Sequence, residues 1–95
     1  MPILEIGRRF NVNKMKYGIG LLGVKDGVNV VFDTPDHFIP HTICLFLNGQ
    51  RLTQNEDYVG SYSGGGTTYY DRITILSAEY APQPGDLLVA DYMVY

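Results

Sequence analysis

The sequence predicts an all-β protein, an antiparallel β-sandwich of about seven short strands with an extended N-terminal arm. Runs rich in Val, Ile, Tyr, Phe and Thr alternate with Gly, Pro, Asn and Asp, which is typical of strands separated by turns. No long stretch shows the apolar spacing of three and four residues that marks a helix. The 95 residues suffice for one core and not two. We divide them into a basic arm at residues 1–17 and a sandwich domain at residues 18–95.

The strands follow from the apolar runs and the turns from the residues between them. The predicted strands are residues 18–24, 28–33, 42–47, 50–52, 58–63, 68–76 and 87–95. Residues 34–40 are predicted as a loop, because Pro35 and Pro40 cannot donate to a strand ladder. Residues 64–66 are three glycines and predict a loop tip.

Six residues are predicted to be structural turn residues: Asp26, Gly27, Asn48, Gly49, Asp57 and Gly85. Asn48 and Gly49 give the strongest hairpin signal, since a type I′ turn needs positive φ at both central residues.

Two predicted strands show alternating apolar and polar residues, so one face of each is expected to be buried and the other exposed. Ile73 and Ile75 alternate with polar residues in the run at 68–76. In the last strand one face is apolar and carries Leu88, Ala90, Tyr92 and Val94, while Asp91 lies on the other. This alternation predicts half-buried strands that cover a shared core.

Charge is distributed unevenly along the chain. Residues 1–17 contain Arg8, Arg9, Lys14 and Lys16 against Glu5 and have a net charge of +3. Because the whole chain has a net charge of −3, the remaining residues have a net charge of −6. The arm of one copy is therefore a candidate to bind the body of another, and we assign these four basic residues to partner binding. The alternative is a solvated tail without a partner. The acidic pI near 5.1 argues against nucleic acid as a partner.

The remaining composition narrows the class of protein. Cys44 is the only cysteine, which excludes an internal disulfide, and its place in an apolar run predicts a buried, inert thiol. No apolar run is long enough to cross a membrane, and the first residues lack the pattern of a signal peptide. We expect a soluble protein without a membrane partner.

Two glycine patterns resemble nucleotide-binding loops and are rejected on context. Residues 18–23 match G-x-G-x-x-G, but turn and strand residues follow them, where a dinucleotide site needs a helix. Residues 63–67 lack the Gly-Lys-Ser/Thr ending of a phosphate-binding loop. We predict no cofactor.

No catalytic or metal site is predicted either. His37 and His41 lie near Asp33 and Asp36, but the prolines around them prevent the helix that would align two histidines. The carboxylates occupy turns and strand ends, and Ser61, Ser63 and Ser77 have no neighbouring histidine in the chain.

The eight tyrosines are the best candidates for a binding surface. Tyr62, Tyr69 and Tyr70 flank the glycine loop, where exposed rings stack on sugars or anchor a protein partner. The alternative is that these tyrosines are half-buried strand residues.

Four motifs occur in an order that resembles a known module. They are KDGVNVVFDTP at residues 25–35, LFLNGQRL at 45–52, NEDY at 55–58 and APQPGDLLVADY at 81–92. The series resembles the small β-sandwich module of tailed-bacteriophage virion proteins, over residues 24–95. The sequence departs from that pattern at Asn55 and Glu56, which replace a glycine, and in the insertion at residues 63–67.

The resemblance implies a non-enzymatic virion structural protein. Such a protein would assemble in several copies at the head-tail neck or collar, or where a tail or fibre attaches. Its partners would be portal, adaptor, tail or fibre proteins and further copies of itself, and its location would be the virion. The alternative function is a carbohydrate-binding module of a phage adhesion apparatus.

Overall fold

The computed structural model describes residues 15–95 and confirms the all-β fold class. Its strands are β1 (Met15–Gly20), β2 (Val31–Phe38), β3 (Cys44–Leu47), β4 (Gln50–Arg51), β5 (Tyr58–Ser61), β6 (Tyr70–Ile75) and β7 (Leu88–Met93). A short 3-10 turn, η2 (Ala78–Tyr80), lies between β6 and β7, and Ser77 caps it by accepting from the Glu79 amide. No helix in the described part of the chain is long and apolar enough to cross a membrane.

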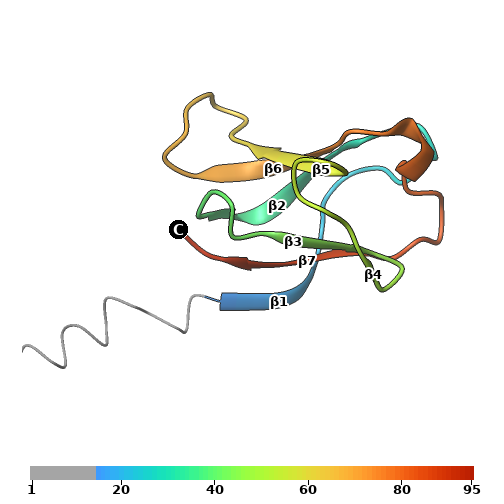
Figure 1. Cartoon of the computed structure of the whole chain (residues 1–95), viewed down its shortest axis with the longest axis horizontal. Coiled ribbons are helices and arrows are strands. Elements are labelled where there is room, and N and C mark those ends of the chain that lie inside the picture. Colours follow the sequence, from blue (N-terminus) through green and yellow to red (C-terminus); the bar gives the residue numbers. More distant parts are fainter. Residues whose placement is uncertain (1–14) are drawn as a thin grey trace, which may run out of the picture.

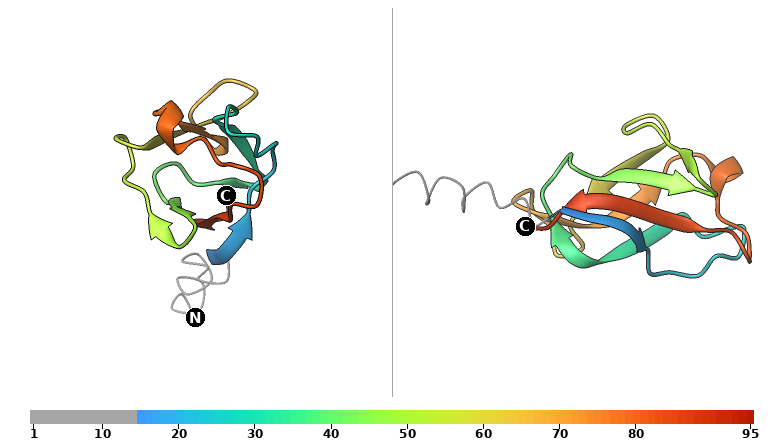
Figure 2. Two further views of the ribbon diagram at one scale, coloured as in Figure 1. Left: turned by 90° about the vertical axis from the view of Figure 1, so that its right-hand side faces the viewer. Right: turned by 90° about the horizontal axis from the view of Figure 1, so that it is seen from below.

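The strands form two antiparallel sheets that face each other, as Figures 1 and 2 show. One sheet has the order β1-β7-β3-β4 and the other the order β2-β6-β5. The seven strands and the two layers agree with the predicted sandwich. Because β1 and β7 are antiparallel and pair Met15 with Met93, the start of β1 lies at the same end of the sandwich as the C-terminus.

The two sheets are joined along one side by backbone hydrogen bonds. Leu22 and Asp33 exchange hydrogen bonds of 2.8 and 2.9 Å just after β1. At the other end the Ile39 amide donates to the Met93 carbonyl at 2.9 Å. These bonds satisfy polar groups that would otherwise be left at the sheet edges.

The core lies between the sheets and is built by alternation along the strands. The fully buried large side chains include Phe32, Phe38, Leu45, Ile73, Ile75, Tyr58 and Tyr92. The predicted alternation in β6 and β7 is confirmed, because Ile73, Ile75, Leu88, Ala90 and Tyr92 are all buried. The buried Tyr58 hydroxyl donates to the Ile43 carbonyl at 2.8 Å, so its polar atom is satisfied.

The prediction of a loop at residues 34–40 is wrong for most of its length, because β2 continues through Pro35 to Phe38. The reason is an irregularity in pairing. Asp33 pairs with Arg72 and Phe38 pairs with Tyr70, so the four residues between them on β2 oppose the single residue Asp71 on β6. Pro35 lies in this bulged stretch, where a missing N–H removes no ladder bond.

The predicted first strand at residues 18–24 is also displaced. The observed β1 begins at Met15, and the proposed boundary between arm and domain at residues 17 and 18 falls inside it. A bulge between Lys16 and Ile19 places Gly18 at φ 63°, and the Gly18 amide donates to the Asp91 side chain at 2.7 Å. The long-range pairing with β7 therefore determines where β1 begins and ends, and the local sequence pattern does not.

Candidate functional site

Four aromatic rings gather at the end of the sandwich where the C-terminus lies. His37 stacks on Tyr69 with ring centroids 4.4 Å apart, and Tyr62 approaches both rings edge-on, at 5.6 and 4.9 Å. Tyr95 lies 4.8 Å from Tyr69. These rings come from β2, the loop between β5 and β6, and the C-terminal residue. Three segments distant in sequence therefore build one aromatic cluster.

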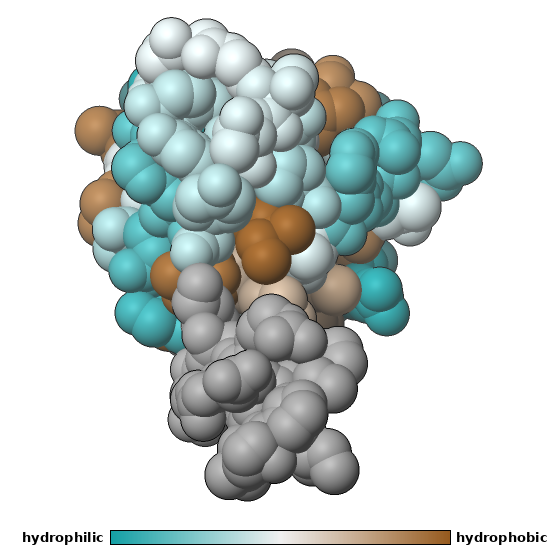
Figure 3. Space-filling model, turned by 90° about the vertical axis from the view of Figure 1, so that its left-hand side faces the viewer, coloured by the Kyte–Doolittle hydropathy of each residue, from teal (hydrophilic) through white to brown (hydrophobic). Residues whose placement is uncertain are grey.

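The glycine-rich loop shapes a small pocket beside this cluster. Tyr62, Gly65, Gly66, Thr68 and Tyr69 line a hollow of about 220 Å³. A Cβ at Gly64 would lie 2.7 Å from the Tyr62 ring, so only glycine lets the loop pass this closely. Figure 3 views this end of the molecule, and the near-neutral surface of its upper part contrasts with the strongly hydrophilic areas beside it.

Asp71 fixes the start of the glycine-rich loop. Its carboxylate accepts hydrogen bonds from the Ser63 amide and the Ser63 hydroxyl, both at 2.8 Å. The serine thus donates directly to a carboxylate and not to a histidine. This arrangement holds the start of the loop in place.

The Tyr62 phenol is held in its neutral form. Its hydrogen bond with Tyr69 is the largest cause that raises its pKa, and the charges of Tyr69 and Asp71 add to the effect. A phenol is already neutral at pH 7, and the raised pKa extends this to higher pH; the Tyr62 hydroxyl can contact a sugar hydroxyl or a backbone group as a neutral hydrogen-bonding group.

Tyr70 does not belong to this cluster. It is half-buried, packs against the core, and lies edge-on to Phe38 at 6.0 Å and to His41 at 6.3 Å. Tyr69 and Tyr70 thus point to opposite sides of the strand, and only Tyr69 joins Tyr62. The structure brings together two of the three tyrosines that the sequence singled out.

The structure describes one of the four basic residues that the sequence analysis assigned to partner binding. Arg8, Arg9 and Lys14 lie outside the described residues, while Lys16 is part of β1. The Lys16 ammonium lies 3.0 Å from the Asp36 carboxylate, so it already has an ion-pair partner within the same chain. The pKa of Asp36 is lowered, first by the hydrogen bond from Lys16 and then by that from Tyr92.

Two of the predicted turn residues use their side chains to close turns. Asp26 accepts from the amides of Val28 and Asn29 at 2.9 and 2.8 Å, and Asp57 accepts from the Thr53 amide at 2.7 Å. Asn48 lies at φ 53° and Gly49 at φ 85°, as the predicted type I′ turn requires. Gly27 and Gly85 also have positive φ, of 84° and 92°.

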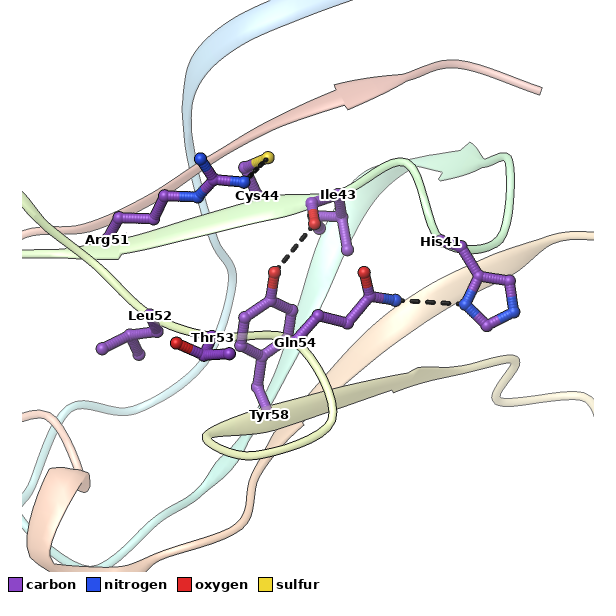
Figure 4. Close-up of a pocket in the computed structure, with 8 residues that line it drawn as sticks. All are labelled: His41, Ile43, Cys44, Arg51, Leu52, Thr53, Gln54 and Tyr58. Carbon is purple, nitrogen blue, oxygen red and sulfur yellow. Dashed lines mark hydrogen bonds between the residues drawn. The ribbon is translucent and has the colours of Figure 1, made fainter.

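A second hollow, which we call the side groove, lies on the open side of the sandwich between β3, β4 and the turn at residues 53–57 (Figure 4). It has a volume of about 310 Å³ and is lined by His41, Ile43, Cys44, Arg51, Leu52, Thr53, Gln54 and Tyr58. The Gln54 amide lies 3.1 Å from His41 Nδ1, and an Arg51 nitrogen lies 3.5 Å from Cys44 Sγ. Cys44 is half-buried, and the expectation of a fully buried thiol is corrected.

The sequence did not single out Arg51 or Gln54, because neither residue type indicates a site by itself. The hairpin of β3 and β4 places Arg51 beside Cys44, and the turn at residues 53–57 carries Gln54 next to His41. No cluster of three or more His, Cys, Asp or Glu suited to a metal ion occurs within residues 15–95. His37 and His41 contact different partners, Tyr69 and Gln54. The glycines at 18 and 20 lie in β1, a strand and not the phosphate-binding turn of a dinucleotide site.

Comparisons with known proteins leave the family open. No model of a protein family matches the chain, and no curated protein or solved structure matches it significantly.

Proposed function

We propose that this protein is a non-enzymatic structural component of a tailed-bacteriophage virion. It assembles in several copies at the head-tail neck or collar, or at a point where a tail or fibre attaches. The observation that carries the proposal is the ordered series of turn motifs at residues 25–35, 45–52, 55–58 and 81–92.

The roles of the motif residues in the fold support a scaffold. Asp26 and Asp57 cap turns, and Asn48 joins its hairpin to the turn before β7 through bonds to Asp86 and Leu87 of 3.1 and 2.8 Å. Residues that recur in such a series serve to hold loops in place.

The proposal assigns the arm to contacts with neighbouring virion proteins. A phage that lacks this gene is complemented either with the full chain or with residues 15–95, and purified particles are assayed for the protein. We expect the truncated chain to fold and to be missing from particles. A full chain in which Glu5 is changed to Gln is the matched control and is expected to be incorporated. Normal incorporation of the truncated chain would contradict the role of the arm.

The aromatic cluster supports a second candidate function, carbohydrate binding. Tyr62 and Tyr69 present rings beside a hollow of about 220 Å³, and aromatic rings stack on the apolar faces of sugars. A glycan array followed by titration tests this candidate. We expect Tyr62→Ala to abolish any binding and Tyr80→Ala, at the other end of the molecule, to preserve it. An array without a positive glycan removes the candidate.

A further inference from the structure

Most of the exposed large apolar side chains gather on one part of the surface. Val28 is 79% exposed, Val24 is 65% exposed and Leu22 is 55% exposed, all in the connection between β1 and β2. Val31 at the start of β2 and Leu76 after β6 are exposed as well. We call these five residues the apolar patch.

Hydrogen bonds hold the five positions next to one another. The Asn29 side-chain amide donates to the carbonyls of Val24 and Val31, at 3.1 and 2.9 Å, and so ties the connection to β2. Leu22 is bonded to Asp33, two residues after Val31 on the same face of the strand. The Ile75 amide donates to the Val30 carbonyl at 2.8 Å, which places Leu76 beside this segment.

The patch is not accounted for by the core. The inward residues of β2, Phe32 and Thr34, are buried, while Val31 lies on the outward face. Scattered exposed apolar residues are normal, but a group held together by loops at one end of a small domain marks a surface that another molecule covers.

The charge around the patch matches the arm. Residues 22–33 and 76–87 contain Asp26, Asp33, Glu79 and Asp86 with Lys25 as their cation, a net charge of −3, and Arg72, which pairs with Asp33 at 2.9 Å, reduces it to −2. Residues 1–14 carry a net +2 from Arg8, Arg9, Lys14 and Glu5. The same segment contains the apolar residues Ile3, Leu4, Ile6 and Phe10. The arm thus contains apolar and basic residues, and the patch contains apolar residues with acidic residues around it. The two are complementary in both respects.

The two surfaces lie at opposite ends of the sandwich. The arm joins β1 at Met15, beside Met93 and the C-terminus, whereas the connection between β1 and β2 lies at the far end (Figure 1). A contact between the arm of one copy and the patch of the next is therefore heterologous. Contacts of this kind repeat head to tail and close into rings when the rotation allows it.

We propose that the apolar patch binds residues 3–10 of the arm of a second copy of this chain. Ile3, Leu4 and Ile6 cover the valines, and Arg8 and Arg9 lie near Asp26, since Asp33 is already paired with Arg72 at 2.9 Å. This inference rests on the proposed assembly function and adds the surface that receives the arm.

The first test measures self-association of the full chain by sedimentation velocity. Val28→Lys removes an apolar contact and repels the basic arm, and we expect it to weaken association at least about tenfold, since a central apolar contact at an interface is worth more than 1 kcal/mol. Val24→Lys repeats the test at a second exposed position. Tyr17→Lys is the matched control, because Tyr17 is 69% exposed and lies outside the patch, and its association is expected to change less than about twofold.

The second test detects the contact directly. In a Cys44→Ser background, one chain carries Ile6→Cys and the other Val28→Cys, and the two are mixed and oxidised. We expect a disulfide between the two different chains, and none above background when Ser63→Cys replaces Val28→Cys. A chain carrying both Ile6→Cys and Val28→Cys that forms only an internal disulfide overturns the contact between copies.

The outcomes separate this inference from the proposed function. If Val28→Lys and Val24→Lys leave association unchanged while Arg8→Glu with Arg9→Glu abolishes it, the patch is overturned and the assembly role of the arm is kept. A full chain that stays monomeric even at its highest soluble concentration overturns the inference. If particles also incorporate the chain without its arm, the proposed role of the arm fails as well.

Discussion

Asp36 is a single carboxylate that connects the two sheets. It lies on β2, and it accepts from Lys16 on β1 at 3.0 Å and from Tyr92 on β7 at 2.9 Å. Both bonds favour the charged carboxylate and lower its pKa. Burial is the largest cause that raises the pKa of the Tyr92 phenol, and the bond to Asp36 adds to it. The phenol therefore remains a donor at neutral pH.

Asp36→Asn is expected to destabilise the protein at neutral pH and to flatten its acid response. Because the pKa of Asp36 is lower in the folded than in the unfolded state, its contribution is present above the unfolded value near 4 and is lost as pH falls through the folded value. We expect a loss of about 1 kcal/mol at pH 7 that shrinks towards pH 2. Urea unfolding at several pH values measures it, with the exposed Glu79→Gln as control. An equal loss at all pH values would contradict the linkage.

At the scale of elements, the hairpin of β3 and β4 depends on more than its turn. Only Phe46 and Leu47 of β3 pair with β4, so the hairpin ladder is short. Asn48 compensates by accepting from the Leu87 amide and donating to Asp86, which joins the hairpin to the turn before β7. One residue thus combines a positive φ with two contacts across 38 and 39 residues of sequence.

Two substitutions at this position separate its two roles. Asn48→Ala loses both hydrogen bonds and places an alanine at positive φ, and we expect a loss of about 2 kcal/mol in the free energy of unfolding. Asn48→Gly keeps the turn conformation and loses only the bonds, so a loss of about 1 kcal/mol is expected. Denaturant unfolding of the three proteins gives the comparison. Equal losses for both variants would show that the backbone conformation of the turn contributes nothing.

The parts of the fold that could be predicted depend on neighbouring residues, and the parts that could not depend on long-range pairing. The hairpin at Asn48 and Gly49 and the alternation around Ile73 follow from neighbouring residues, and the structure confirms them. The course of β2 through Pro35 depends on a bulge against β6, which no local pattern contains. The start of β1 depends on pairing with residues 89–93, at the other end of the chain.

The candidate site was predictable to a similar extent. Tyr62 and Tyr69 flank one loop, so sequence spacing placed them together. His37 and Tyr95 join them only because β2 and the end of the chain lie side by side, with the Tyr95 amide donating to the His37 carbonyl at 2.9 Å. The side groove was missed although all its lining residues lie between His41 and Tyr58, because the predicted hairpin and turn do not by themselves show a hollow between them.

At the scale of the whole molecule, β1 is where the described structure begins, directly after the basic residues of the arm. Residues 15–17 contribute the Met15–Met93 and Lys16–Tyr92 pairs and the ion pair to Asp36. Residues 15–17, which the charge pattern assigned to the arm, therefore belong to the described sandwich. Residues 1–14 have a net charge of +2, and Lys16, which follows them, is paired with Asp36.

Two truncations that differ by three residues test this boundary. A chain of residues 15–95 keeps all the core side chains that the structure describes and all four β1 pairs, so its free energy of unfolding is expected to stay within about 0.5 kcal/mol of the full chain. A chain of residues 18–95 loses the first β1 pairs and leaves Asp36 without its ammonium partner, and we expect it to lose about 2 kcal/mol. Denaturant unfolding followed by circular dichroism measures both. If the two truncated chains were equally stable, β1 before its bulge would contribute nothing, and the boundary would lie at residue 18 as the charge pattern alone suggested.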